Sequence, residues 1–195
     1  GRLHLVSVAQ GREVAAVDLP ADLGITDLLL AGDRAILIGT SWAAVPFADD
    51  TPSGDIPEER LDFAPTTAST VVAEVDIAGD ALTLGETFSL DGTYVSARMT
   101  DDVVRLELRT SPADALPFVS PANGTEGALD AAREHNRQMV AEAVPEDLLP
   151  RWHRLSADGA PADEGALLGC ENVHAPNTFA GFAMVAVASI DIGDG

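Results

Sequence analysis

The stretch VVAEVDIAGDALTLGETFSL, residues 71–90, alternates apolar and polar side chains on both sides of a Gly-Asp pair. A period of two interrupted by such a pair is typical of a β-hairpin, because successive side chains of a strand point to opposite faces. SARMTDDVVRLELRT, residues 96–110, has the same plan around an Asp-Asp pair. The two stretches therefore predict two consecutive hairpins of antiparallel sheet.

Both hairpins occur once before in the chain. LHLVSVAQGREVAAVDL and DLLLAGDRAILIGT, within residues 3–40, repeat the alternation and the turn chemistry of the pair within residues 71–110. The turn glycines Gly11 and Gly79 are 79 − 11 = 68 residues apart. Because two hairpins recur in the same order, the chain contains a four-strand unit twice.

A third copy of the unit begins at about residue 182, where FAMVAVASIDIGDG matches the earlier STVVAEVDIAGD. Two insertions interrupt the repeat. Residues 41–68 are rich in Pro, Asp and Thr without sustained periodicity, and residues 111–181 occupy the equivalent place one unit later. Each insertion is therefore predicted to lie between the second and third strands of a four-stranded sheet.

Repeated antiparallel four-strand units build β-propellers, in which each unit forms one blade. The predicted fold class is mainly β, with antiparallel four-stranded blades and one helix-containing insertion. Propellers have about 4–8 blades, and two units with the start of a third do not close such a ring. We therefore expect residues 1–195 to form one partial β-propeller domain, a fragment of a larger propeller. An open sandwich of packed sheets is the alternative.

The second insertion contains the clearest helical pattern, TEGALDAAREHNRQMVAEAV at residues 125–144. One face of this predicted helix carries Leu129, Ala132, Asn136, Met139, Val140 and Ala143. Asn123 or Thr125 is the expected N-cap, and Pro145 is expected to end the helix. The stretch SADGAPADEGA, residues 156–166, has the composition of a flexible linker.

The composition restricts the partners of the chain. It has 32 acidic and 11 basic residues, which give a formal net charge of −21. Such a surface repels phosphate backbones and anionic lipids, so no nucleic-acid binding is expected. No stretch reaches the ~18 uninterrupted apolar residues of a membrane-spanning helix, so no membrane insertion is expected. Acidic surfaces suit solubility, cation binding or a basic partner, and solubility is the simplest interpretation.

The sequence shows no familiar catalytic motif. It lacks a Gly-x-Ser-x-Gly elbow, a glycine-rich phosphate loop and a His-Glu-x-x-His segment. Cys170 is the only cysteine, so this chain alone forms no disulfide and no cysteine-based zinc or iron–sulfur site. We therefore predict no catalytic residue and favour a non-enzymatic protein.

Three residues of the second insertion are the best candidates for contact with a ligand. Arg151, Trp152 and His153 follow one another in the stretch PEDLLPRWHRL. An indole between two basic side chains offers a stacking platform that lines a ligand groove. The simpler interpretation of Trp152 is an anchor that holds a loop on the core.

The candidate metal ligands are His174, Asp191 and Asp194. His174 lies four residues after Cys170, but a glycine and a proline bracket this pair and do not favour a shared helix face. A buried structural role is the simpler interpretation of Cys170. The aspartates near the end of the chain offer oxygen ligands to Ca²⁺, without the alternating pattern and closing acidic residue of a calcium loop. The prediction is therefore no cofactor, with Ca²⁺ as the alternative.

A family resemblance covers most of residues 66–192. It rests on TTASTVVAEVDI, FSLDGTYVSARMTDDVVRLELRT, EHNRQMV with DLLPRW, and GCENVHAP with FAGFAMVAVASIDI. Through these stretches the chain resembles secreted bacterial and archaeal proteins with a C-terminal β-propeller domain, which are distantly related to WD-repeat proteins. The resemblance implies a propeller fold and a location at the cell envelope or outside the cell, reached through an export signal upstream of this sequence. It implies no catalytic residue.

These observations predict an exported binding or scaffold module. The two insertions are expected to crowd one rim, where a protein or a surface polymer would bind, and the remaining blades of the parent chain are further partners. The alternative is a propeller-based hydrolase or metal-dependent enzyme with its site at that rim, where His153 and His174 would converge with a carboxylate. A third hypothesis is a structural domain of a larger surface protein.

Overall fold

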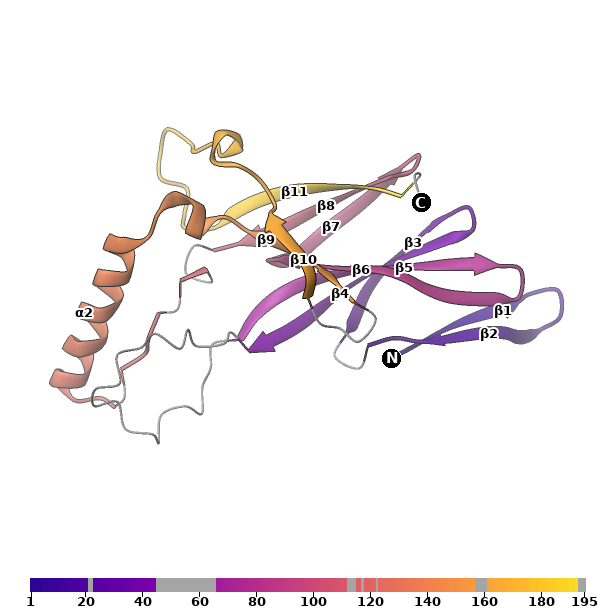
Figure 1. Ribbon diagram of the computed structural model, residues 1–195, viewed down its shortest axis with the longest axis horizontal. Coiled ribbons are helices and arrows are strands. Elements are labelled where there is room, and N and C mark those ends of the chain that lie inside the picture. The colour runs from indigo at the N-terminus through magenta and orange to yellow at the C-terminus, as the bar shows by residue number, and fades with distance from the viewer. Residues whose placement is uncertain are drawn as a thin grey trace.

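The computed structural model describes residues 1–20, 23–44, 66–111, 115–116, 118–121, 123–156 and 161–192. Its strands form three antiparallel sheets, and the helix α2 (Glu126–Glu142) projects from one end of them (Figure 1). The predicted fold class, antiparallel β with a helix-containing insertion, is confirmed.

The four predicted hairpins are all present, and they are distributed over the three sheets. The first sheet pairs β1 (Arg2–Ser7) with β2 (Arg12–Asp18). The second sheet contains β3 (Gly24–Ala31), β4 (Arg34–Ala44), β5 (Thr66–Ala78) and β6 (Ala81–Asp91). The third sheet contains β7 (Thr93–Thr100), β8 (Val103–Thr110) and β11 (Met184–Asp191), in the order β11-β8-β7.

The sheets cut across the repeat units of the sequence. The second hairpin of the first unit, β3–β4, pairs through β4 and β5 with the first hairpin of the next unit. The order β3-β4-β5-β6 is therefore a four-stranded blade that begins halfway through one repeat unit. The sheet β7-β8-β11 repeats the first three strands of this order. The hairpin β1–β2 precedes the four-stranded blade in the sequence.

The hairpin turns explain the Gly-Asp and Asp-Asp pairs of the sequence. Gly79 takes the left-handed backbone conformation at φ +61° in the β5–β6 turn, and Asp101 takes it at φ +53° in the β7–β8 turn of the third sheet. Glycine adopts this conformation without a steric penalty, and aspartate tolerates it better than most residues.

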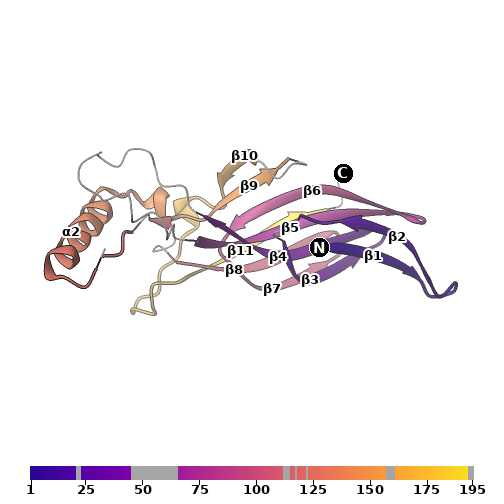
Figure 2. The ribbon, with the colours of Figure 1, turned by 90° about the horizontal axis from the view of Figure 1, so that it is seen from below.

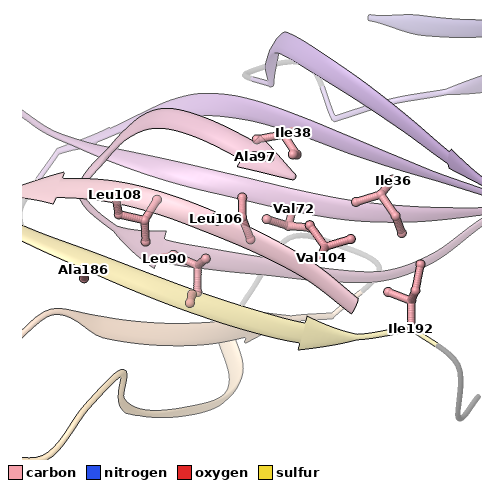
Figure 3. Packing of buried hydrophobic residues seen from close by; sticks show 11 residues of the cluster. Ile36, Ile38, Val72, Leu90, Ala97, Val104, Leu106, Leu108, Ala186 and Ile192 are labelled. Atoms are coloured by element: carbon pink, nitrogen blue, oxygen red, sulfur yellow. The ribbon is translucent and has the colours of Figure 1, made fainter. Parts of the chain in front are cut away.

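The middle sheet is covered on both faces, and β4 lies at the centre of the packing. Ile36 and Ile38 face the third sheet, where they join a cluster with Val104, Leu106 and Leu108 (Figure 3). The intervening side chains of β4 face the first sheet, in a second cluster made of Leu19, Ala35, Leu37, Ala73 and Val75. Alternation along one strand therefore supplies both interfaces, as in successive blades of a propeller.

A tight connection leads from the middle sheet to the third sheet at Gly92. This residue has φ +115°, and a Cβ atom placed on it would lie 2.5 Å from the Thr110 Cγ2 atom. The Thr70 hydroxyl group donates a hydrogen bond of 2.8 Å to the Gly92 carbonyl oxygen. Only a residue without a side chain fits this crossing between sheets.

Both insertions leave the sheets at the same rim. Ala44 at the end of β4 pairs with Thr66 at the start of β5, and Thr110 at the end of β8 pairs with Met184 at the start of β11. The hairpin turns of the stacked sheets lie at the opposite rim, while α2 projects from the insertion rim (Figures 1 and 2).

The second insertion is partly as predicted. Thr125 caps α2 by accepting a hydrogen bond from the Ala128 amide, which confirms the predicted start. Of the predicted apolar face, Ala132 is buried, whereas Leu129 and Val140 are exposed. After α2 come a short 3₁₀ helix, η2 (Pro145–Leu148), the strands β9 (Arg151–Leu155) and β10 (Pro161–Ala166), and a second 3₁₀ helix, η3 (Cys170–Asn172).

The prediction of a flexible linker over residues 156–166 is wrong for its second half. β10 pairs with β9, and β9 pairs with β6, so that this hairpin extends the middle blade to six strands in the order β10-β9-β6-β5-β4-β3. The polar composition of β10 is that of an exposed edge strand, where acidic residues and a proline discourage further pairing. No helix in the described part of the chain is long and apolar enough to cross a membrane.

Candidate binding surface on the added hairpin

The added hairpin β9–β10 positions all three predicted ligand residues. Leu90 pairs with Trp152, and Ser89 pairs with His153, so β9 continues the alternation of β6. Trp152 therefore lies on the face that joins the core, whereas Arg151 and His153 point to the opposite face. The structure thus separates the indole from the two basic groups that flank it in the sequence.

Trp152 serves as an anchor for the hairpin. Its ring packs against the larger core cluster and meets the Phe88 ring edge-on, with centroids 6.5 Å apart and planes at 61°. Gly165 of β10 lies opposite it, and a Cβ atom on Gly165 would be 2.8 Å from the indole Nε1 atom. The indole fills the space that this glycine leaves open. A role of Trp152 in ligand contact stays a prediction.

Arg151 and His153 share one carboxylate. The Glu164 Oε1 atom lies 3.3 Å from Arg151 Nη2, and the Glu164 Oε2 atom lies 3.1 Å from His153 Nδ1. The Arg151 amide donates a hydrogen bond of 2.9 Å to the Asp91 carboxylate, which fixes the start of β9. Arg151 is exposed and His153 is half-buried.

Arg154 repeats this pattern on the other face of the hairpin. Its guanidinium group lies 3.6 Å from a Glu86 oxygen and 3.7 Å from an Asp163 oxygen. We name the group Glu86, Arg151, His153, Arg154, Asp163 and Glu164 the hairpin charge cluster. Exposed ion pairs of this kind contribute little to stability, at most about 1 kcal/mol each. The cluster therefore offers charged groups to a partner at little cost to the fold.

Sequence reasoning missed the two acidic members of this cluster on β10. Asp163 and Glu164 lie in the stretch assigned to a linker. The signal for them was weak, because a six-residue edge strand with a proline at its start carries little hydrophobic periodicity.

The predicted burial of Cys170 is wrong, because its side chain is exposed. The thiol donates a hydrogen bond of 3.5 Å to the Glu146 carboxylate. Partial desolvation and this hydrogen bond raise the pKa of Cys170 above its ordinary value. The thiolate, which is the nucleophilic form, is therefore disfavoured.

The predicted metal ligands are not brought together in the described residues. His174 lies on the exposed segment after η3, and Asp191 is exposed at the end of β11. Asp194 lies outside the residues that the structure describes. Within those residues, no group of three or more His, Cys, Asp or Glu side chains is placed to hold a metal ion. Calcium binding stays a prediction.

One polar link between sheets was not anticipated. The Tyr94 hydroxyl group on β7 donates a hydrogen bond of 2.7 Å to the Asp27 carboxylate on β3. Desolvation and this bond raise the pKa of Tyr94 to about 12. The hydrogen bonds from Tyr94 and from the Leu28 amide lower the pKa of Asp27. The DGTYVSARM segment, residues 91–99, is part of the stretches that carry the family resemblance, and it supplies both the Gly92 crossing and this link.

A family model described as "Beta propeller domain" matches residues 1–195 of the chain. No curated protein and no solved structure matches it.

Proposed function

Because the chain belongs to the β-propeller domain family, we propose that it acts as a binding or scaffold module at the cell envelope or outside the cell. Its partner is a protein or a surface polymer, and the remaining blades of a parent propeller pack against its sheets. The family resemblance to secreted proteins supports the location.

The added hairpin carries this proposal. A four-stranded blade does not need β9 and β10, yet they extend the middle sheet and are anchored by Trp152 and by the Asp91 carboxylate. Rigid elements that present exposed polar groups are suited to recognition, because their side chains are ordered before the partner arrives. The hairpin charge cluster presents paired carboxylates and basic groups on both faces of the hairpin, with Glu164 on one face and Glu86 and Asp163 on the other. It therefore favours a partner with paired charges of both signs.

The experiment is a binding assay with the whole chain as immobilised bait. Extracts of the cell envelope and of the cytoplasm are compared, and bound proteins and polysaccharides are identified. We expect a partner from the envelope extract that is retained by the unmodified chain and lost with the double variant Arg151→Ala, Arg154→Ala. Arg12→Ala is the matched control, because Arg12 is an exposed arginine in the β1–β2 hairpin, far from the added strands in the sequence. A partner held equally by all three baits would contradict the role of the added hairpin.

The alternative, a hydrolase or metal-dependent enzyme at the insertion rim, makes a different prediction. It requires an activity on ester, phosphate or glycoside substrates that falls with both His153→Ala and His174→Ala. Detection of such an activity, with folding of both variants verified by circular dichroism, would replace the binding proposal.

A further inference from the structure

Two aromatic side chains near the insertion rim contact each other and are otherwise open to solvent. Phe179 and Phe182 are 77% and 79% exposed, and their rings meet edge-on with centroids 5.0 Å apart. They lie on the segment between η3 and β11. Burying a phenylalanine side chain is strongly favourable, and this pair leaves that contribution unused in the isolated chain.

The same segment is the least charged part of an acidic chain. Residues 172–190 contain no Asp, Glu, Lys or Arg, and this is the longest such run in the sequence. We call Phe179 and Phe182, with the uncharged residues around them, the phenylalanine knob. The chain as a whole carries a net charge of −21, but the segment that carries the knob contains no carboxylate that would repel a second molecule.

An apolar groove lies along α2. It is open, has a volume of about 800 Å³ and is lined by Phe118, Val119, Ser120, Arg133, Asn136, Arg137, Val140 and Ala141. The Asn136 side chain fixes its wall, because it accepts a hydrogen bond of 2.8 Å from the Val119 amide and donates one of 2.9 Å to the Val119 carbonyl. Val140 is 56% exposed within it.

The charged groups of this α2 groove are already neutralised. Arg133 lies 3.4 Å from Asp130, and Arg137 lies 2.6 Å from Glu134. A carboxylate ligand would have to displace one of these partners, whereas an aromatic ring would stack on a guanidinium plane without displacing it. The groove is therefore better matched to an uncharged aromatic group than to an anion.

We propose that the phenylalanine knob of one copy of this chain occupies the α2 groove of a second copy. Both surfaces belong to the second insertion, and Figure 1 shows α2 and the segment before β11 at the same end of the molecule. A two-fold axis at that end lets each copy donate its knob and accept its partner's, which closes the assembly as a dimer. This inference is independent of the proposed function, because it uses no residue of the hairpin charge cluster.

The net charge sets the conditions under which the dimer forms. Two chains of −21 repel each other, and this repulsion is screened over a Debye length of about 10 Å at 0.1 M salt and about 3 Å at 1 M. The contact surfaces carry no unpaired charge, so salt weakens the repulsion and leaves the contact intact. Association is therefore expected to strengthen as salt is added, the opposite of an interface made of ion pairs.

Sedimentation equilibrium of the whole chain, at low and at high salt, tests the proposal. We expect a monomer–dimer equilibrium in which the unmodified chain dimerises more strongly at high salt. The double variant Phe179→Ser, Phe182→Ser should weaken dimerisation roughly tenfold or more, because central aromatic anchors dominate interface energies. Val8→Ser is the matched control, since Val8 is 95% exposed in the turn between β1 and β2.

A mixing experiment identifies the two halves of the contact. Val140→Asp is expected to block the groove and to abolish dimerisation by itself. A mixture of this variant with the Phe179→Ser, Phe182→Ser variant retains one intact knob and one intact groove, so it should form a heterodimer that neither variant forms alone. All three substituted side chains are exposed, and circular dichroism verifies that the variants fold.

Three results would overturn the proposal. The first is a chain that stays monomeric at every salt concentration, whether its knob stays exposed or folds onto the groove of the same chain. The second is a dimer that is unaffected by the knob and groove variants. The third is loss of dimerisation in both variants without recovery on mixing.

Discussion

The Tyr94–Asp27 hydrogen bond illustrates what a single residue contributes to this fold. Tyr94 is the only tyrosine of the chain, and its hydroxyl group joins β7 to β3 of the neighbouring sheet at 2.7 Å. Desolvation of the phenol, together with this hydrogen bond, raises the pKa of Tyr94, whereas the hydrogen bond lowers the pKa of Asp27.

The absorbance of the phenolate therefore reports on the fold. We expect the only tyrosine to titrate at about 12 in the native chain and near its ordinary value of 10 in urea. Because folding raises the pKa of Tyr94, the contribution of Tyr94 to the stability of the fold is complete below pH 10 and is lost as the pH rises toward 12. Native and denatured titrations that coincide would show that the hydrogen bond to Asp27 does not persist in solution.

The Tyr94→Phe variant isolates the same contact. We expect it to lower the free energy of unfolding at neutral pH by about 1 kcal/mol, the usual net contribution of a hydrogen bond. The variant should also lose the part of the alkaline decline in stability that belongs to Tyr94. Urea denaturation at pH 7 and at pH 11 measures both effects. An identical alkaline decline in the two proteins would contradict the assignment.

At the scale of elements, the added hairpin depends on a glycine. A Cβ atom on Gly165 would lie 2.8 Å from the Trp152 indole, so Gly165→Ala forces the ring away from the core. We expect a destabilisation of about 1–3 kcal/mol, as for overpacked cores, together with faster amide hydrogen exchange in β9 and β10. Gly124→Ala is the control, because nothing lies within 4 Å of a Cβ atom there. Equal effects of the two substitutions would argue against the anchoring role of Trp152.

The elements were predictable to the extent that their signals were local. The alternation in residues 71–90 and the turn preferences of Gly and Asp determine a hairpin without reference to the rest of the chain. The α2 start was predictable for the same reason, since the Thr125 side chain accepts its capping hydrogen bond from the Ala128 amide, only three residues away. In contrast, β9 has five residues, and its pairing partner β6 lies about sixty residues earlier in the sequence.

The candidate site was predictable only in part for a related reason. Arg151 and His153 were identified from their residue types, but their shared partner Glu164 is brought to them by a strand pairing. The phenylalanine knob and the α2 groove were missed because an apolar residue in the sequence does not reveal whether it is covered. Exposure is a property of the packed chain.

At the scale of the whole molecule, stability depends on sheets that stack through both faces of the middle blade. Leu106 of β8 is completely buried between the middle and third sheets (Figure 3). Leu106→Ala is expected to lower the free energy of unfolding by about 2–5 kcal/mol, because it removes buried methyl groups and leaves a cavity. Leu30→Ala is the control, since Leu30 is 61% exposed. A loss below 1 kcal/mol for Leu106→Ala, measured by urea denaturation, would show that the two sheets are not packed as described.

The pairing of Ala44 with Thr66 has a consequence for how this chain can be altered. The two residues are held opposite each other by the ladder between β4 and β5, so the ends of whatever segment joins them are already closed. Doubling the length of a flexible loop between fixed ends costs only about 0.6 kcal/mol. The same holds for Thr110 and Met184 one blade later. These two positions are therefore suitable sites for inserting foreign peptides or whole domains. The blades would hold two inserted segments at the same rim.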